Sequence, residues 1–420
     1  MKKPSFLWAA SLVVILLAGC SLHGASTSNT PKAVSLNKAS AMLFSGKTEQ
    51  LTATIDPADA SNQVLAWSTD NAGVASVSSS GLVTGLADGT ANITVTTAGG
   101  KTAACTVTIC DVGGVIRAAG RLVETQNNDG GWDWQNPDTN PSTGMPSPPN
   151  TLGVTAQGVL DAYRVTGKSE YLAAVMNAYS ELLTNSTNGD PSIRKIRGLD
   201  ILFLVRLSEA TGIPAYASFA RARYQAAVTE LGGGTATGLA QYIRNARLSQ
   251  SLPPLIAWDI DLYVRAALSL DGYFPNQGFG ADAAAMTEVI YTSLYQGTVD
   301  FNISNQGQDE YWLSITGAVE AFTITGLHAA ERDSLMTSLL ASQQPDGHFP
   351  GVVSGGNVQT TAYALMTLVK AGKEVPAARA MAYLARAQGA NGGWMETDGF
   401  EYTEVDSEVL HAMYECVEGL

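Results

Sequence analysis

The sequence predicts a multidomain fold, an all-β sandwich followed by an all-α (α/α)6 toroid, behind a short N-terminal export segment. Three observations support this prediction. Residues 33–110 alternate apolar and polar side chains in short runs, and residues 111–420 carry apolar side chains at helical spacing. A segment built on Gln, Gly and an aromatic residue recurs in the helical part, which indicates stacked helix pairs.

Length and charge limit the classes of function. The chain has 420 residues, enough for two or three domains, and 45% of them are hydrophobic, enough for sizeable cores. It has 24 basic and 38 acidic side chains, a formal net charge of -14. Because binding of nucleic acid needs a basic surface to meet the phosphates, this balance argues against a nucleic-acid partner.

The first 19 residues have the pattern of a signal peptide. Lys2 and Lys3 precede an apolar run over residues 6–18, which is too short to span a membrane. The tetrapeptide Leu-Ala-Gly-Cys that ends at Cys20 resembles the lipobox of bacterial lipoproteins. The resemblance implies that Cys20 is lipidated and that the membrane is a partner through this anchor. An ordinary signal peptide cleaved near Ala25 is the alternative.

Lipidation would place the protein in the cell envelope, extracytoplasmic and lipid-anchored, at the outer membrane or cell surface. Residues 20–32 are rich in Ser, Thr, Ala and Asn without apolar periodicity, and they predict a flexible tether.

The first folded unit, residues 33–110, predicts a β-sandwich. Seven short runs fit a period of two and are separated by turn residues. They cover residues 34–36, 50–55, 64–67, 74–77, 81–84, 91–95 and 104–109.

The same unit resembles the bacterial immunoglobulin-like group 2 family. The resemblance rests on the segments Val64–Val77, Gly81–Gly85 and Gly89–Val95. Members occur in adhesins and as spacers on surface enzymes, so the family does not fix a function. Trp67 has an inward strand position, which favours a core residue over a platform for sugars.

Thirteen helices are expected from Asp111 onward, separated by turns in which Gly follows one helix and Pro enters the next. The apolar periodicity places them at residues 113–126, 152–166, 169–184, 193–211, 214–231, 237–249, 257–270, 281–296, 309–325, 329–343, 358–371, 375–388 and 404–417.

Three repeats end a helix with Gln and reach an aromatic residue five or six positions later. They are Gln126 to Trp132, Gln344 to Phe349 and Gln388 to Trp394. These segments resemble the Gln-Trp repeats of the terpenoid cyclase and protein prenyltransferase toroids. The resemblance implies a closed ring over residues 111–420, with each Gln capping an outer helix and stacking on the aromatic ring.

The chemistry of those families is not matched. Squalene cyclase-type enzymes carry an Asp-x-Asp-Asp cluster. The segment Asp259-Ile-Asp261-Leu262 matches only two of its three aspartates, through Asp259 and Asp261. The prenyltransferase zinc site needs Asp, Cys and His, but Cys416 is the only cysteine after residue 110 and the histidines are scattered. We therefore expect no cofactor and no metal site, although a bound divalent cation stays an open alternative.

Acidic and aromatic side chains gather near the expected starts of inner helices, where a closed ring brings them to one mouth. The candidate catalytic acids are Asp259, Asp261, Asp309, Glu310, Asp406 and Glu408, and Asp129, Asp133 and Glu404 belong to the same set of acids near helix starts. The candidate substrate-binding aromatics are Trp132, Trp134, Trp258, Trp312 and Tyr402. Two carboxylates could serve as general acid and base while aromatic rings stack on sugars. Alternatively, acids in a first helical turn only complement the helix dipole.

Two further features concern charge and cysteine. The basic segment Arg194–Arg197 could hold an anionic group, but a solvated helix face is the preferred interpretation. Because a closed ring joins its first and last helices, Cys110 and Cys416 could form a disulfide after export.

The sequence therefore favours a surface lipoprotein whose toroid binds or processes an extracellular polymer, with a glycan as ligand. A non-enzymatic adhesion protein and a terpenoid cyclase-like enzyme are the alternatives. Residues 396–420 hold eight acidic side chains and no lysine or arginine, so the acidity is concentrated on the ring. This favours a neutral sugar or a cation over a polyanion near that segment.

Overall fold

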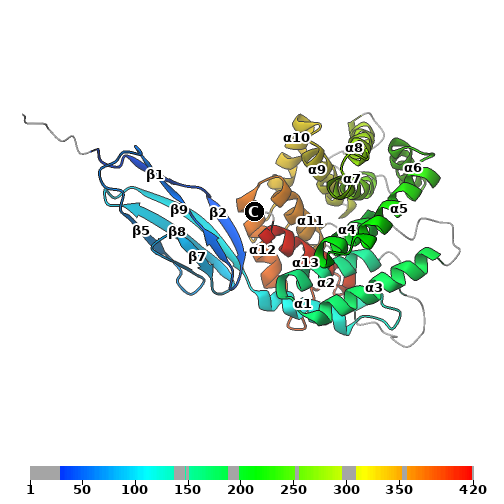
Figure 1. The fold of residues 1–420 in the computed structure, drawn as a ribbon, viewed down its shortest axis with the longest axis horizontal. Coiled ribbons are helices and arrows are strands. Elements are labelled where there is room, and N and C mark those ends of the chain that lie inside the picture. Colours follow the sequence, from blue (N-terminus) through cyan, green and yellow to red (C-terminus); the bar gives the residue numbers. More distant parts are fainter. Residues whose placement is uncertain are drawn as a thin grey trace, which may run out of the picture.

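A computed structural model describes residues 29–136, 147, 151–187, 198–250, 255–295, 309–351 and 357–418. An N-terminal β-domain stands beside a larger ring of helices (Figure 1). The predicted fold class, an immunoglobulin-like sandwich followed by an α-helical toroid, is confirmed.

The β-domain has two main sheets and a marginal pair. One sheet has the order β2-β9-β8-β5, with β2 at Ser40–Phe44, β9 at Thr102–Cys110, β8 at Gly89–Thr97 and β5 at Leu65–Thr69. The second has the order β3-β7-β6, with β3 at Thr48–Gln50, β7 at Leu82–Gly85 and β6 at Ala75–Val77. Strand β1 (Ala33–Leu36) pairs with β4 (Ala53–Asp56). Trp67 packs against the sandwich core, which agrees with its predicted structural role.

The predicted strand set missed β2, which pairs in parallel with β9. All five residues of β2 are buried, so the strand shows no alternation of apolar and polar side chains. Ala41 and Leu43 belong to the core of the sandwich, whereas Met42 and Phe44 belong to the core of the helical ring. Strand β2 is therefore covered on both faces, and the period-two pattern that reveals half-exposed strands is lost.

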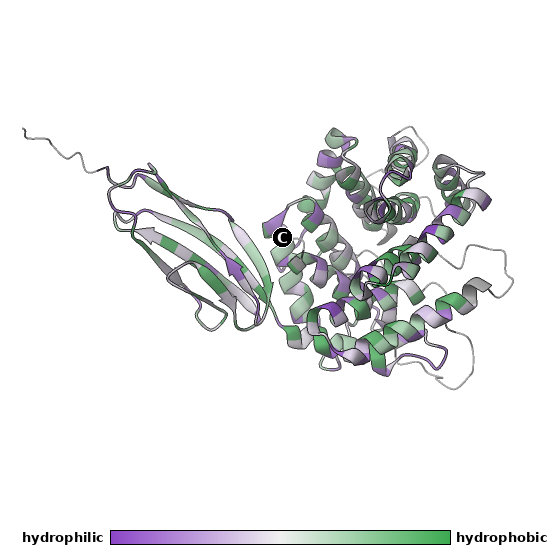
Figure 2. Ribbon diagram, in the orientation of Figure 1, coloured by the Kyte–Doolittle hydropathy of each residue, from purple (hydrophilic) through white to green (hydrophobic). Residues whose placement is uncertain are grey.

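Each of the thirteen predicted helices has a counterpart within a few residues of its expected bounds. Six of them form the inner wall of the ring: α2 (Leu152–Thr166), α4 (Gly198–Thr211), α7 (Leu255–Tyr273), α9 (Asp309–Thr325), α11 (Asn357–Lys370) and α13 (Thr403–Glu418). In this order each packs on the next, and α13 packs on α2, which closes the ring. Their buried stretches are hydrophobic, as the green segments of Figure 2 show.

The outer helices precede the inner ones in the chain. They are α1 (Val112–Glu124), α3 (Ser169–Thr187), α5 (Pro214–Glu230), α8 (Phe279–Tyr295), α10 (Ala329–Ser342) and α12 (Glu374–Ala387). The remaining helix, α6 (Ala236–Ser249), lies between α5 and α7 in the chain and packs on α7 and α8. Residues near the amino ends of α2, α4, α7, α11 and α13 line one cavity, so these inner helices begin at one mouth of the ring.

The repeat segments fasten neighbouring outer helices together. The Gln126 Nε2 donates to the carbonyl oxygens of Gly130 and of Ala174 on α3, both at 2.8 Å. The Gln388 Nε2 donates in the same way to Gly392 and to Gly114 on α1, which closes the outer wall.

In the middle repeat, which ends at Phe349, the bonding residue is Gln343, not the predicted Gln344. The Gln343 Nε2 donates to Gly347 at 3.0 Å and to Pro376 on α12 at 2.9 Å. Gln343 lies six positions before Phe349, the same spacing as in the other two repeats. The corrected pairing makes all three repeats alike.

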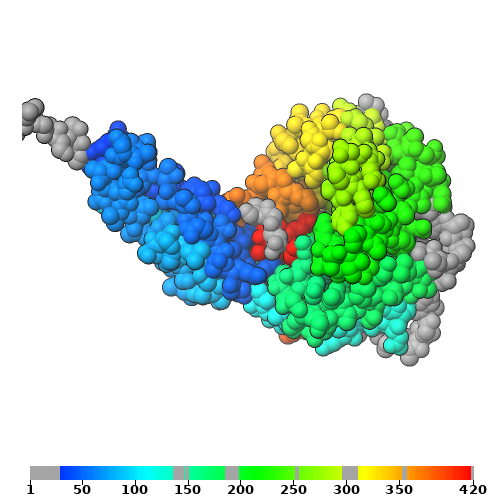
Figure 3. Space-filling view, viewed as in Figure 1, coloured from blue at the N-terminus to red at the C-terminus, as the bar shows by residue number. Residues whose placement is uncertain are grey.

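The β-domain packs on the carboxyl end of the ring's last helix. Strand β2 contacts α12 and α13, and Figure 3 shows the blue β-domain against the orange and red helices. The Ser40 hydroxyl donates to a carboxylate oxygen of Glu374 on α12, and the Cys416 Sγ lies 2.9 Å from the Met42 Sδ. The two domains thus share one continuous core cluster at this junction.

Candidate functional site

A cavity of about 520 Å³ lies at the mouth where the inner helices begin. The first turns of α4, α7, α11 and α13 line it, and α6 closes one side. The partial positive charge at helix amino ends favours acidic side chains at such a mouth. Asp200 and Glu404, in the first turns of α4 and α13, have these positions.

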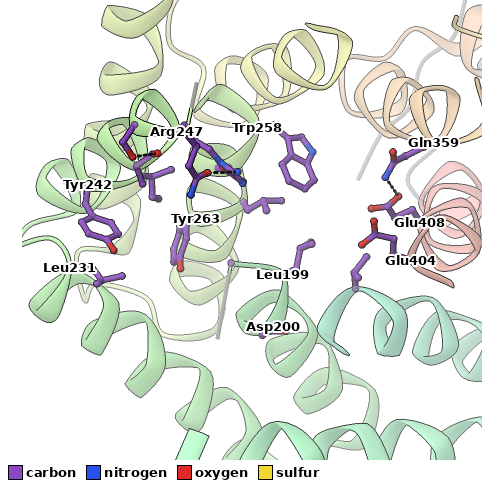
Figure 4. A pocket seen from close by; sticks show the side chains of 18 residues that line it. Leu199, Asp200, Leu231, Tyr242, Arg247, Trp258, Tyr263, Gln359, Glu404 and Glu408 are labelled. Atoms are coloured by element: carbon purple, nitrogen blue, oxygen red, sulfur yellow. Dashed lines mark hydrogen bonds and ion pairs between the residues drawn. The ribbon is translucent and has the colours of Figure 1, made fainter. Parts of the chain in front are cut away.

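One wall of the cavity carries two glutamates from α13. Glu404 and Glu408 are one helical turn apart, and Figure 4 shows both on the same side of the cavity. The Glu408 side chain is buried, and its oxygens accept hydrogen bonds from Gln359 Nε2 at 3.0 Å and from the Tyr363 hydroxyl at 2.5 Å. Burial, together with the nearby charge of Glu404, raises the pKa of Glu408 to about 8. Glu408 therefore holds its proton at neutral pH.

The opposite wall carries an ion pair. The Arg247 guanidinium, from α6, donates two hydrogen bonds to the carboxylate of Asp259, near the amino end of α7. This ion pair joins α6 to α7 at the cavity. In Figure 4 the Arg247 wall faces the wall of Gln359, Glu404 and Glu408 across the cavity.

Aromatic side chains also line the cavity. Trp258 lines the cavity and meets Tyr363 edge-to-face, with ring centroids 5.6 Å apart. The Trp258 indole Nε1 is buried and has no hydrogen-bond partner among the described residues. Tyr242 and Tyr263 complete the aromatic lining. The cavity thus offers carboxyl groups on two walls and flat apolar surfaces between them, an arrangement suited to a polyhydroxylated ligand.

Of the predicted acids, the structure brings Asp259 and Glu408 to this cavity, together with Glu404. Asp261 is buried between inner helices, where it pairs with Arg265 at 3.9 Å. Burial and the neighbouring Glu320 raise the pKa of Asp261 well above its usual value. Asp406 is also buried, and its Oδ1 accepts the backbone N–H of Trp394 at 2.7 Å, so this acid holds a repeat turn.

Two more of the predicted acids, Asp129 and Asp133, are described and are not part of the cavity lining. Asp129 accepts hydrogen bonds from the backbone N–H groups of Gly131 and Ser147, which fixes a turn. The carbonyl oxygen of Asp133 accepts a hydrogen bond from the Thr403 hydroxyl. The side chains of Asp309 and Glu310 lie outside the described residues, as does the basic segment 194–197.

Among the predicted aromatics, only Trp258 lines the cavity. Trp132 is fully buried and its Nε1 donates to the Leu122 carbonyl oxygen at 2.6 Å, so it is a core residue. Trp312 is also buried. Trp134 precedes the short strand β10 (Gln135–Asn136), and its side chain is 48% exposed. Its carbonyl oxygen accepts a hydrogen bond from the backbone N–H of Thr403. The Tyr402 hydroxyl, on β11 (Glu401–Tyr402), donates to Asp398 at 2.7 Å.

Several residues of the cavity lining were not predicted from the sequence. Arg247 and Tyr242 on α6 belong to the wall opposite Glu404 and Glu408, and two more are Gln359 and Asp200. One signal was available. Six helix pairs need twelve helices, whereas thirteen were expected, and the unpaired helix α6 is the one that supplies this wall. Asp200 could have been found as an acid in the first turn of a predicted inner helix.

The predicted Cys110–Cys416 disulfide is not formed in the structure. Both thiols are free and buried at the junction of the two domains. Burial raises the pKa of each thiol. The Cys416 Sγ instead contacts the Met42 Sδ.

The segment with Cys20 lies outside the described residues. Within the described ranges, no helix combines the length and apolar character that crossing a membrane requires. The same part of the chain contains no cluster of three His, Cys, Asp or Glu side chains placed to hold a metal ion.

Comparison with known proteins identifies the β-domain. Residues 31–107 match the family described as bacterial Ig-like domain (group 2). Among curated proteins, a lacto-N-biosidase from Bifidobacterium bifidum is 44% identical over 69 residues. This match covers 16% of the chain and only 6% of the relative's length.

Comparison with solved structures places the helical part in the α/α toroid fold. An inactive variant of the α-1,6-mannanase GH76A from Salegentibacter sp. HEL1_6, in complex with α-1,6-mannotriose, aligns over 74% of this chain and 99% of its own. The TM-score is 0.51 and the sequence identity 9%, so the likeness concerns the fold. The type II terpene cyclase MstE from Scytonema aligns over 73% of the chain with a TM-score of 0.46 and 14% identity.

Proposed function

We propose that the toroid binds an extracellular glycan in the cavity at the amino ends of the inner helices and cleaves a glycosidic bond there. The observation that carries this proposal is the pairing of a protonated Glu408 on one wall with the Asp259 carboxylate on the other. Glycoside hydrolysis needs this combination, a carboxylic acid beside the leaving oxygen and a carboxylate across the sugar ring.

In the proposed reaction Glu408 is the general acid and donates its proton to the glycosidic oxygen. Its pKa of about 8 keeps it protonated at neutral pH, and the Glu404 charge contributes to this value. Asp259, held by Arg247, is the carboxylate that acts on water or on the anomeric carbon. Trp258 supplies an apolar ring face for a sugar, while the charged walls disfavour a terpenoid hydrocarbon.

The relatives guide the choice of substrates for a test. The similar toroid is named as an α-1,6-mannanase, inactivated by replacing two consecutive aspartates. The present sequence has no Asp-Asp pair, and Asp309-Glu310 is its only pair of consecutive acids, so those aspartates are not transferred to it. We place α-1,6-mannan first in the substrate panel, followed by neutral glucans, xylans and galactans.

The experiment measures oligosaccharide release from this panel by the full chain and by Glu408→Gln. We expect release by the wild-type chain and a loss of at least about 100-fold in Glu408→Gln, the usual contribution of a general acid. Glu170→Gln, an exposed glutamate on outer helix α3, is the matched control and should keep full activity. Binding of an oligosaccharide without turnover by the wild-type chain would contradict the enzymatic part and favour the adhesion alternative.

We also propose that Cys20 anchors the protein in the cell envelope through lipid, with the immunoglobulin-like domain between anchor and toroid. The Leu-Ala-Gly-Cys segment after an apolar run supports this. Fractionation of cells that express the wild-type chain or Cys20→Ala tests it. We expect the wild-type chain in the membrane fraction and the variant outside it, and equal partition would refute the anchor.

A further inference from the structure

Exposed hydrophobic side chains are concentrated on two short segments that pair with each other. In the described part of the chain, nine large hydrophobic side chains are exposed, and three of them belong to these segments. They are Trp134 at 48%, Met395 at 61% and Phe400 at 51% exposure. Two of the three exposed aromatic rings in the described ranges are therefore found here, and the third is Tyr295 on α8.

The two segments form a small sheet. Strand β11 pairs with β10 on one side, and on the other side Glu401 pairs with Met395. The backbone N–H of Glu396 donates to the Phe400 carbonyl oxygen at 2.8 Å, which extends this second pairing. We call β10, β11 and residues 395–396 the rim sheet.

The rim sheet is attached to the lining of the cavity at two points. The Trp134 carbonyl oxygen accepts the backbone N–H of Thr403, the residue before Glu404. The Glu396 carboxylate accepts the backbone N–H of Gln359 at 2.8 Å. Glu404 and Gln359 both line the cavity on the same side (Figure 4), so the rim sheet continues this wall outward.

The rim sheet turns aromatic rings toward solvent. Phe400 and Tyr402 are two residues apart in extended chain, so their side chains lie on one face, about 7 Å apart. Glu401, between them, is 4% exposed and its carboxylate accepts the Arg121 Nε at 2.8 Å, so the opposite face points inward. Trp134, at the start of the neighbouring strand, adds a third ring. We call Trp134, Phe400 and Tyr402 the outer platform.

Hydrogen bonds fix the turn that carries the outer platform. The Asp398 Oδ1 accepts the backbone N–H of Phe400 at 2.9 Å, and its Oδ2 accepts the Tyr402 hydroxyl at 2.7 Å. Gly399, at φ 86°, donates its backbone N–H to the Glu396 carbonyl oxygen at 3.0 Å. The backbone beneath the rings is therefore in place before a ligand arrives, which lowers the entropic cost of binding.

The surroundings of the rings suit a neutral sugar. The exposed Gln135 and Asp398 side chains both bond to the Tyr402 hydroxyl, so an amide and a carboxylate lie beside the ring. Sugars place apolar faces on aromatic rings and bond through their hydroxyl groups to such polar neighbours. Residues 396–420 hold eight acidic side chains and no lysine or arginine, a charge that repels polyanionic glycans and anionic membranes.

We propose that the outer platform binds the part of a neutral glycan chain that extends out of the cavity. Trp134, Phe400 and Tyr402 offer ring faces to successive sugars. Gln135 and Asp398 offer hydrogen-bonding groups to the sugar hydroxyls. The inference rests on the proposed function for the class of ligand, because one chain occupies both the cavity and the outer platform. It adds a binding site outside the cavity, and it makes affinity rise with the length of the glycan.

Titration calorimetry with a trisaccharide and a hexasaccharide from α-1,6-mannan, a neutral glucan and a xylan tests the outer platform. The full chain carries Glu408→Gln throughout, so that no ligand is cleaved during the titration. We expect a hexasaccharide to bind more tightly than its trisaccharide. Adding Trp134→Ala or Phe400→Ala should raise the hexasaccharide Kd about fivefold, the usual contribution of one aromatic contact, and the trisaccharide Kd less than about twofold.

Tyr295→Ala is the matched control, because it removes the third exposed ring, on α8, and should leave both Kd values unchanged. Trp134 and Phe400 are exposed, so their variants should keep the Tm of the parent chain. The inference is overturned by absence of binding to all three hexasaccharides, by equal affinity for the two lengths, or by a hexasaccharide Kd that neither substitution changes. Dimerisation that Phe400→Ala abolishes would also overturn it, by assigning the outer platform to a second copy of the chain.

These outcomes are separable from failure of the proposed cleavage. A wild-type chain that releases no oligosaccharide, while hexasaccharide binding depends on Phe400, would refute the enzymatic proposal and support the outer platform. Cleavage by the wild-type chain with a hexasaccharide KM that Phe400→Ala and Trp134→Ala leave unchanged would support the enzymatic proposal and refute the outer platform.

Discussion

The titration of Glu408 predicts an unusual effect of pH on stability. Glu408 is buried against Gln359 and Tyr363 and has a folded-state pKa of about 8, above the usual 4.5 of a glutamate. Glutamine has the shape of the protonated acid but carries no titrating proton. Replacing Glu408 by Gln should therefore remove a pH-dependent part of the free energy of unfolding and leave the packing nearly unchanged.

The sign follows from proton binding. Between pH 4.5 and about 8 the folded state keeps the Glu408 proton and the unfolded state has lost it. The folded state then binds more protons, so the free energy of unfolding falls as pH rises, by about 1.4 kcal/mol per pH unit at full effect. Over this window the loss in the wild-type chain amounts to at most about 5 kcal/mol. The Glu408→Gln variant should lack this loss.

Urea unfolding of both proteins at several pH values between 5 and 9, followed by tryptophan fluorescence, measures the difference. We expect the two proteins to be similar near pH 5 and Glu408→Gln to be the more stable one at pH 9. Glu170→Gln controls for the loss of an exposed carboxylate and should follow the wild-type curve. Parallel curves for the wild-type chain and Glu408→Gln across the whole range would refute the raised pKa, and with it the role of Glu408 as a proton donor at neutral pH.

Three further predictions concern the fold. Trp132→Ala should lower the free energy of unfolding by about 3–5 kcal/mol because Trp132 is fully buried. Trp134→Ala, at an exposed position two residues later, should change it by less than about 0.5 kcal/mol, and thermal denaturation of both variants measures the difference. Gln343→Ala should lower the free energy of unfolding by about 1–3 kcal/mol because two hydrogen bonds are lost, and Gln344→Ala should lower it much less. Equal losses of the two variants in urea unfolding would contradict the corrected repeat pairing. A fragment that begins at residue 111 exposes the ring surface that Met42 and Phe44 cover, each worth about 1.5–3 kcal/mol, and its Tm should fall below that of the ring in the full chain.

Much of the fold could be predicted because its patterns are local. Apolar periodicity located each helix, since an amphipathic face repeats every turn, and the turn residues separated the helices. Strand β2 could not be found in this way, because its alternate residues face two different cores. The choice of Gln344 over Gln343 was wrong because two adjacent glutamines cannot be told apart by composition. Only the spacing to Phe349, measured against the other repeats, distinguishes them.

The candidate site was less predictable because it depends on the direction of individual side chains. Asp259 and Asp261 are two residues apart on α7, and helical geometry turns them to different surroundings. One lines the cavity beside Arg247, and the other is buried beside Arg265. Sequence alone also cannot tell that Asp406 supports a turn while Glu408, two residues later, faces the cavity. Residue type and position near a helix start identified the right region, and the rotation of each helix decided the members.

The domain junction bears on how the cavity would meet a polymer. Immunoglobulin-like modules are often regarded as spacers, and a spacer joined by a free linker leaves its cargo able to turn. Here β9 ends at Cys110 and α1 begins at Val112, so a single residue separates the sandwich from the ring. Met42 and Phe44 on β2 belong to the ring's core, and Ser40 bonds to Glu374 on α12. Because a shared apolar core resists rotation, the β-domain holds the ring in one orientation. If Cys20 is the anchor, the β-domain and the ring therefore move together as one unit relative to the membrane.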